Sequence, residues 1–259
     1  MELIAKDIVA GYGAGPSVVQ GVSLTAQPGT VTTLLGPNGC GKSTFLKTLS
    51  RVLSPRSGSV TVDGSLVHDM APREASRIIG MLAQQPIAPA GITVSDLIAR
   101  GRHPYRGLFG GLSATDKEAI SNAMEMAGVT SLATVPVADL SGGQRQRVWF
   151  AMVLAQDTPI ILLDEPTTYL DPAHALMVLD LAREQALLGK TVIAVLHDLQ
   201  LAGTYSDQLI LMKSGEVVAS GAPASVLTPS NLASVYGLRA EVWEDPSSDS
   251  PVIVPRGVV

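Results

Sequence analysis

Residues 36–44 read Gly36-Pro37-Asn38-Gly39-Cys40-Gly41-Lys42-Ser43-Thr44. The stretch fits the pattern G-x-x-x-x-G-K-[ST], whose glycines let a loop curl until its backbone N–H groups surround the oxygens of a phosphate. In such a loop Lys42 reaches the β- and γ-phosphates of a nucleotide, and the Ser43 hydroxyl ligates Mg²⁺. A β-branched run over 30–35 precedes the loop, and a helical pattern over 43–51 follows it with the positive end of its dipole toward the phosphate. We therefore expect a phosphate loop, and we assign all nine residues to nucleotide binding.

A second motif ends an apolar run and reads Ile160-Ile161-Leu162-Leu163-Asp164-Glu165. Carboxylate oxygens are ligands that Mg²⁺ prefers, so Asp164 is expected to hold the ion directly or through water. Glu165 is expected to act as the general base that polarises the attacking water. Taken alone, the pattern fits equally well a buried strand that ends in a solvated acidic turn. The phosphate loop elsewhere in the chain favours the metal and catalytic roles.

The composition limits the class of protein. Hydrophobic residues make up 46% and charged residues 16% of the 259 residues, which is typical of a globular chain and not of a disordered one. The net charge is −5 and no basic run stands out, so nucleic acid is not expected as a main partner. No apolar stretch approaches the roughly 18–20 residues of a membrane-spanning helix, and the first seven residues lack the pattern of a signal peptide. Cys40 is the single cysteine, so no internal disulfide is expected, which fits the reducing cytoplasm.

The order of strand and helix patterns predicts an α/β fold. The first part reads as strands, and the middle of the chain reads as helices over 93–100, 115–127 and 142–154. Beyond it, strand patterns alternate with helical ones, which predicts a largely parallel sheet with helices on its faces. The remaining strands are expected over 2–9, 18–26, 58–62, 160–163, 191–196, 208–213 and 217–220, and the remaining helices over 173–188, 199–205, 222–227 and 231–236. A terminal hairpin is expected from 241–243 and 252–254.

The segment Leu140-Ser141-Gly142-Gly143-Gln144 carries a family resemblance. It resembles the signature motif of ABC ATPases, and the order and spacing of the motifs match that family over about residues 2–235. Ser141 and the glycine N–H groups would stand at a helix N-terminus, which suits them to a phosphate. The family implies that Ser141, Gly142, Gly143 and Gln144 meet the γ-phosphate held by the opposite subunit of a head-to-tail homodimer. The alternative is an ordinary capped helix with glycine spacers.

The resemblance also implies how the chain divides. It implies one ABC ATPase domain over 1–259, a P-loop NTPase core with a mostly parallel sheet. That core, with an N-terminal antiparallel β part, would take 1–85 and 156–235. An inserted helical subdomain would take 86–155, and a C-terminal hairpin or tail would take 236–259.

Three smaller motifs resemble further parts of the family's catalytic site. Gln84 resembles the glutamine that senses Mg²⁺ and the γ-phosphate, and it is preferred to its neighbour Gln85 because of its spacing to 91–94. His197 follows the strand pattern 191–196 and resembles the switch histidine that contacts the γ-phosphate. Asp171 resembles the aspartate that links the two subunits, and it is assigned with the nucleotide-binding residues. With Glu165 these give the expected catalytic residues Glu165, His197 and Gln84, and the expected metal ligands Ser43, Gln84 and Asp164.

Tyr12 resembles the aromatic residue that stacks on adenine, although Gly11-Tyr12-Gly13 is also compatible with an ordinary turn tyrosine. Cys40 raises a separate hypothesis, which is that its alkylation blocks ATP binding because the phosphate loop is crowded. The alternative is that any small residue is tolerated at this position.

A narrower resemblance is to the ATPases of iron–siderophore importers, and the cobalamin and haem importers are close relatives. It depends on the segments 101–109, 148–152, 166–171 and 236–255. It implies ATP and Mg²⁺ as cofactors and integral-membrane permease subunits as partners, with an extracytoplasmic substrate-binding protein as an indirect one. It also implies a peripheral location on the cytoplasmic face of the inner membrane.

Two other classes compete with a transport ATPase. Non-transport ABC proteins of DNA repair have two half-motifs that a long coiled coil separates. Ribosomal ABC proteins carry two tandem ATPase domains. Neither feature is present in this sequence. A P-loop kinase or GTPase would share the phosphate loop but not the signature motif or His197. An ABC ATPase releases free phosphate, whereas a kinase makes a phosphorylated product, so the product distinguishes the two classes.

Overall fold

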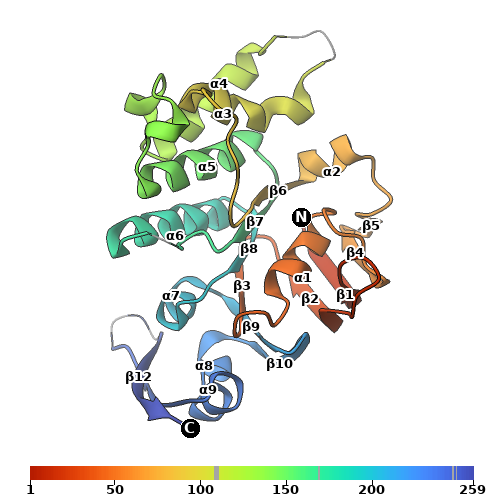
Figure 1. Ribbon diagram of the computed structural model, residues 1–259, viewed down its shortest axis with the longest axis vertical. Coiled ribbons are helices and arrows are strands. Elements are labelled where there is room, and N and C mark those ends of the chain that lie inside the picture. The colour runs from red at the N-terminus through yellow and green to blue at the C-terminus, as the bar shows by residue number, and fades with distance from the viewer. Residues whose placement is uncertain (108–110, 169, 247, 249) are drawn as a thin grey trace.

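The central sheet contains six strands in the order β10-β9-β3-β8-β7-β6 (Figure 1). The computed structural model describes residues 1–259 except 108–110, 169, 247 and 249. Neighbouring strands from β9 to β6 run parallel, and β10 alone is antiparallel to its neighbour. Every residue of β3, β7 and β8 is buried, as expected for parallel strands covered on both faces. The bounds are β3 (Val31–Leu35), β6 (Ile79–Leu82), β7 (Ile160–Asp164), β8 (Thr191–Val195), β9 (Gln208–Lys213) and β10 (Glu216–Gly221).

A second, antiparallel sheet has the order β2-β1-β4-β5 and contains the N-terminal strands. Its buried residues alternate with exposed ones, which is typical of a sheet with one face on a core. Helix α1 (Lys42–Leu49) packs Phe45 and Leu46 into the core shared with this sheet. The bounds are β1 (Leu3–Ala10), β2 (Val19–Ala26), β4 (Ser57–Val62) and β5 (Ser65–Leu66). The expected antiparallel β part beside a mostly parallel sheet is therefore confirmed.

A helical unit occupies the middle of the chain and lies at the top of Figure 1. Its longest helix, α5 (Gly142–Gln156), begins with a capping box, in which Ser141 and Gln144 satisfy each other's backbone N–H groups. Ser113 and Asp116 form the same device on α4 (Ala114–Met126). The other elements are α3 (Val94–Ala99), η1 (Arg100–Tyr105), η2 (Thr130–Leu132) and η3 (Val137–Asp139).

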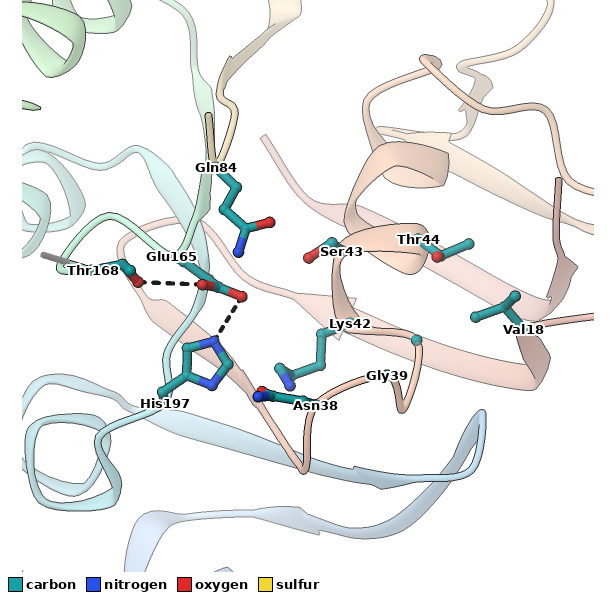
Figure 2. Close-up of a pocket in the computed structure, with 11 residues that line it drawn as sticks. Val18, Asn38, Gly39, Lys42, Ser43, Thr44, Gln84, Glu165, Thr168 and His197 are labelled. Carbon is teal, nitrogen blue, oxygen red and sulfur yellow. Dashed lines mark hydrogen bonds and ion pairs between the residues drawn. The ribbon is translucent and has the colours of Figure 1, made fainter. Parts of the chain in front are cut away.

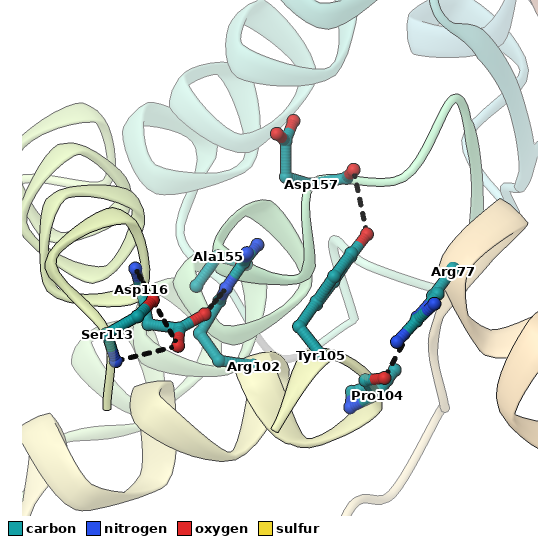
Figure 3. A network of polar contacts seen from close by, with 8 residues as sticks. All are labelled: Arg77, Arg102, Pro104, Tyr105, Ser113, Asp116, Ala155 and Asp157. Atoms are coloured by element: carbon teal, nitrogen blue, oxygen red, sulfur yellow. Dashed lines mark hydrogen bonds and ion pairs between the residues drawn. The ribbon is translucent and has the colours of Figure 1, made fainter. Parts of the chain in front are cut away.

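A polar network holds the short helix η1 against α4 and α5 (Figure 3). The Arg102 guanidinium donates to Asp116 Oδ1 at 2.8 Å and to the Ala155 carbonyl at 2.9 Å, and both charged side chains are buried. The same guanidinium lies 4.0 Å from the centre of the Tyr105 ring, whose hydroxyl donates to the Asp157 carbonyl. The C-terminal end of α5 is thereby fixed to η1.

The C-terminal third alternates helices with the last strands of the central sheet and ends in a hairpin. The expected terminal hairpin forms, with β11 and β12 paired antiparallel from Leu238 to Val258. The bounds are α6 (Pro172–Leu187), α7 (Leu199–Tyr205), α8 (Pro223–Val226), α9 (Pro229–Tyr236), β11 (Leu238–Glu244) and β12 (Pro251–Val258).

Helix α2 (Pro72–Ile78) and strand β6 are among the elements that were not expected from the sequence. Helix α2 runs directly into β6, the edge strand of the central sheet. The seven residues of α2 bury only Ala75, so its sequence carries little helical period. The division of the chain at 85, 155 and 235 stays a prediction. Among the helices that the described residues form, none is both long and apolar enough to cross a lipid bilayer.

Candidate active site

The carboxyl ends of four parallel strands bring four of the predicted motifs to one edge of the central sheet. The phosphate loop follows β3, Glu165 follows β7, His197 lies two residues beyond β8, and Gln84 lies two residues beyond β6. Open α/β sheets bind their ligands at this edge. The cavity there has a volume of about 520 Å³ (Figure 2). It is lined by Val18, Asn38, Gly39, Gly41, Lys42, Ser43, Thr44, Gln84, Glu165, Thr168 and His197.

The phosphate loop curls tightly around the Lys42 ammonium. Gly41 has a φ of 107°, and a Cβ there would lie 2.9 Å from the Val18 carbonyl oxygen, so the position requires glycine. Lys42 is only 5% exposed, and its ammonium donates to the carbonyl oxygens of Gly36 at 2.7 Å and Pro37 at 3.1 Å. The first helical turn of α1 begins at Lys42. An anion in this cavity would meet a cation and free helix N–H groups.

Ser43 lines the cavity and contacts Asp164, which does not line it, although 121 residues separate the two. The Ser43 hydroxyl donates to Asp164 Oδ1 at 2.8 Å. Burial raises the pKa of the Asp164 carboxyl, although the Ser43 hydrogen bond and nearby lysines oppose this effect. A divalent cation beside this 1% exposed side chain would favour its ionised form.

The residues present fit Mg²⁺. No group of three or more His, Cys, Asp or Glu side chains within the described part of the chain could hold a metal ion. Mg²⁺ commonly takes only one or two protein ligands, because phosphate oxygens and water complete its octahedron. The hydroxyl of Ser43 and the carboxylate of Asp164 are oxygen donors of the required kind.

Glu165 is paired with His197 by a contact of 2.6 Å between Oε1 and Nε2. The Thr168 hydroxyl donates to the other carboxylate oxygen at 3.2 Å. Burial tends to raise the pKa of Glu165, but hydrogen bonds from His197, Gln84 and Thr168 and the charge of His197 outweigh it, so the pKa lies below its usual value. Glu165 also has a φ of 53°, a conformation that a non-glycine residue adopts at some cost. A carboxylate held ionised beside a phosphate site can accept a proton from water.

The signature segment lies outside the cavity of its own chain. Ser141, Gly142, Gly143 and Gln144 are absent from the lining, and Ser141 and Gly142 are exposed at the N-terminus of α5. Gly143 packs against His174, since a Cβ at Gly143 would lie 3.4 Å from the imidazole ring.

Asp171 is also exposed and absent from the lining. It caps α6, because its carboxylate accepts from the His174 backbone N–H at 3.0 Å and contacts the His174 ring at 2.7 Å.

Tyr12 is 52% exposed and lies beside Lys47, with 3.5 Å between the Tyr12 hydroxyl and the Lys47 ammonium. It does not line the cavity. Gln84 lines the cavity, whereas its neighbour Gln85 does not and is exposed. Cys40, Gly36 and Pro37 support the loop and do not line the cavity.

Val18 and Thr168 are lining residues that the sequence did not indicate. The sequence offered one signal for Thr168, which is its position three residues after Glu165. At this spacing the Thr168 N–H closes a turn on the Glu165 carbonyl at 3.3 Å. Val18 had none, because its role depends on packing between β2 and the phosphate loop.

Comparison with known proteins assigns the family. The family model described as ABC transporter matches residues 19–168, more than half of the chain. The chain is 45% identical to the ferric enterobactin transport ATP-binding protein FepC of Escherichia coli (strain K12) over 256 residues, 98% of this chain and 94% of the relative. It is 42% identical to the iron(3+)-hydroxamate import ATP-binding protein FhuC of Bacillus subtilis (strain 168), with 99% and 96% covered.

A solved dimeric bacterial ABC transporter cassette superimposes with a TM-score of 0.76 at 28% identity, over 85% of this chain and 98% of that one. The expected family resemblance is confirmed. The geometry of the site agrees with these comparisons. This chain therefore belongs to the ABC transporter family, as one of its ATP-binding ATPase subunits.

Proposed function

We propose that this chain is the ATP-hydrolysing subunit of an importer that carries an iron–siderophore-type chelate across the cytoplasmic membrane. Five relatives at 39–45% identity are named for transport or import of ferric enterobactin, iron(3+)-hydroxamate, achromobactin, a siderophore and petrobactin. A relative named for cobalamin import is 37% identical, and the chain covers 61% of its length. The balance of these relatives supports an iron chelate as cargo.

The observation that carries the chemical part is the cavity that brings Lys42 and Ser43 together with the Glu165–His197 pair. Asp164 is hydrogen-bonded to Ser43. The Lys42 ammonium would exchange the carbonyls of Gly36 and Pro37 for the β- and γ-phosphate oxygens of ATP. Ser43 and Asp164, with Gln84 nearby, would hold Mg²⁺, which when bound neutralises charge on the phosphates.

Glu165 is the proposed general base. It would take a proton from the water that attacks the γ-phosphorus, since its carboxylate is held ionised in the cavity wall. His197, which lines the cavity and contacts Glu165, would orient the carboxylate and face the γ-phosphate. Gln84 would position the same water and report on the phosphate to the helical unit.

The Ser141–Gln144 segment and Asp171, which lie outside the cavity lining, support a head-to-tail homodimer. They cannot complete the cavity of their own chain as it stands, so a second copy would bring them to the other chain's phosphate loop. In this proposal the helical unit docks on integral-membrane permease subunits at the cytoplasmic face of the inner membrane. An extracytoplasmic binding protein delivers the chelate to those subunits.

Reconstitution with integral-membrane permease subunits tests the proposal. We expect release of inorganic phosphate from Mg-ATP that rises when a binding protein loaded with an iron–siderophore is added. Stimulation by cobalamin-loaded or haem-loaded binding proteins alone would assign a related importer. A phosphorylated product in place of free phosphate would contradict the ATPase mechanism.

A further inference from the structure

His197 stands at the junction between a buried strand and a short helix. Strand β8 ends two residues before it, and the intervening Leu196 N–H donates to a carbonyl of β3 at 3.3 Å. On the other side Asp198 caps α7, because its Oδ1 accepts from the backbone N–H groups of Gln200 at 2.8 Å and Leu201 at 2.9 Å. The direction of the His197 side chain therefore depends on where the first turn of α7 lies.

Helix α7 depends on its neighbours for its position. It has seven residues, and helices this short are marginal in water without tertiary contacts. Its C-terminal end is tied to α6, where the Tyr205 hydroxyl donates to Asp180 at 2.8 Å. Its middle packs closely on the C-terminal part of the chain, since a Cβ at Gly203 would lie 3.1 Å from Pro251 Cγ and 3.3 Å from Leu227 Cδ1.

Gln200 ties the first turn of α7 to strand β12, which lies beside this helix in Figure 1. Its side-chain Nε2 donates to the Pro251 carbonyl at 3.2 Å, and its Oε1 accepts from the Ile253 N–H at 3.1 Å. The side-chain amide thus binds two alternate backbone groups of β12, as one residue of a neighbouring strand would. Because Gln200 is three positions after His197, the terminal hairpin is joined closely to the histidine.

The hairpin is a firm support for this contact. Strands β11 and β12 are paired from Leu238 to Val258, and the Val259 N–H donates to the Gly237 carbonyl at 2.8 Å. The Arg256 guanidinium also reaches across the pair of strands to Glu241 at 3.0 Å. A side chain bound to β12 is therefore bound to an element with its own backbone ladder.

We propose that Gln200 is a positioning residue of the hydrolytic site, through which the terminal hairpin holds α7 and keeps the His197 ring against Glu165. The inference rests on the proposed function and deepens it, because it assigns the hairpin a role in ATP hydrolysis. The His197–Glu165 contact is 2.6 Å, and misplacement of a catalytic group by about 1 Å can cost as much as 10²-fold in rate. The family model ends at residue 168, so α7 and the hairpin lie outside the part of the chain that it matches.

The first test is the pair of kinetic constants of Gln200→Met in the full-length protein. This change removes both hydrogen bonds to β12 and keeps the length of the side chain. We expect kcat to fall about threefold to tenfold, the value of one hydrogen bond, with the KM for ATP within about twofold of wild type. Gln27→Met is the matched control, because Gln27 donates to Glu2 from the loop between β2 and β3. It should leave both constants unchanged.

A double-mutant cycle with His197→Ala separates positioning of the histidine from a general effect on the fold. If Gln200 acts through His197, Gln200→Met should change the single-turnover rate of the His197→Ala protein by less than about twofold. Ile253→Pro removes the donor on the hairpin and leaves Gln200 in place, so it should show the same pattern if Gln200→Met folds poorly. A kcat equal to that of the control, a higher KM with unchanged kcat, or a loss that repeats in the His197→Ala protein would overturn the inference.

The ring resonances of His197 provide a measurement that needs no turnover. The chain has four histidines, so His197→Ala assigns the signal in an NMR spectrum of the nucleotide-free protein. We expect this signal to shift in Gln200→Met and to keep its place in Gln27→Met. An unshifted signal in Gln200→Met would contradict the inference. If the wild-type protein hydrolysed no ATP, the proposed function would fail, but the spectrum would still decide whether Gln200 positions His197.

Discussion

Lys42 is the charged group that the phosphate loop encloses, and its removal is expected to weaken nucleotide binding itself. Lys42→Ala should raise the dissociation constant for ATP about 10- to 100-fold, since a hydrogen bond to a charged group contributes about 1.5–3 kcal/mol. Titration calorimetry with a non-hydrolysable ATP analogue measures the change. Lys190→Ala is the control, because Lys190 pairs with Asp157 on the surface. Equal affinities for Lys42→Ala and the control would rule out the proposed role.

Glu165 has a different expected effect, because it acts on the chemical step. Glu165→Gln should lower the turnover number roughly 10²- to 10⁴-fold while ATP remains bound, since the amide cannot accept the proton. Phosphate release and retained nucleotide can be measured on one sample. Glu74→Gln, a change on α2, serves as the control. A turnover number near that of the control would show that another group is the base.

The predictability of the site differs from residue to residue. Lys42, Ser43 and Gln84 were assigned from fixed spacings, and the structure places all three in the cavity wall. The Ser43–Asp164 contact joins residues far apart in sequence, so only the fold brings them together. The roles assigned to these residues stay predictions.

At the scale of elements, the buried Arg102–Asp116 pair fixes η1 to α4. Its hydrogen bonds from Arg102 and then Ser113 lower the pKa of Asp116 to about 2, below its usual value of 3.8. The unfolded chain therefore binds the proton more readily, so the stability from this pair is complete above about pH 4 and disappears as the pH falls toward 2.

Asp116→Ala should accordingly destabilise the protein at pH 7 by about 3 kcal/mol, because it leaves a buried guanidinium unpaired. Urea unfolding at pH 7 measures the change, and the difference from wild type should shrink on acidification below about pH 4. Glu118→Ala, at an exposed position of the same helix, is the control. A variant as stable as this control would show that Arg102 finds other partners.

The elements that the sequence predicted are those with a clear period. Helix α5 and strands β7 and β8 were expected within two residues of their observed bounds, because each has a strongly apolar pattern. The pair α2 and β6 was missed, since seven residues followed by four are too few to show either period. The missed strand is the one that delivers Gln84 to the cavity.

For the whole molecule, the head-to-tail dimer predicts that two inactive variants restore each other. Lys42→Ala disables the phosphate loop and Ser141→Arg disables the signature segment, so each homodimer should be inactive. A mixed dimer would still contain one intact pair, and equal mixing should recover up to about a quarter of the wild-type ATPase rate. The assay needs only phosphate release after subunit exchange. A mixture as inactive as its components would contradict the shared site.

The overall architecture was more predictable than its details. Alternating strand and helix patterns around a helical middle gave the α/β class and the mostly parallel sheet, which the structure confirms. The strand order could not be read from the chain, because β3 inserts between β9 and β8, strands that come more than 150 residues later.

The resting position of the Lys42 ammonium has a consequence for the protein between transport cycles. Two carbonyls of its own loop already satisfy this cation, so the fold does not depend on a nucleotide to compensate it. We therefore expect the subunit to stay folded when it holds no nucleotide, so a fall in cellular energy should stop uptake without exposing the subunit to proteases.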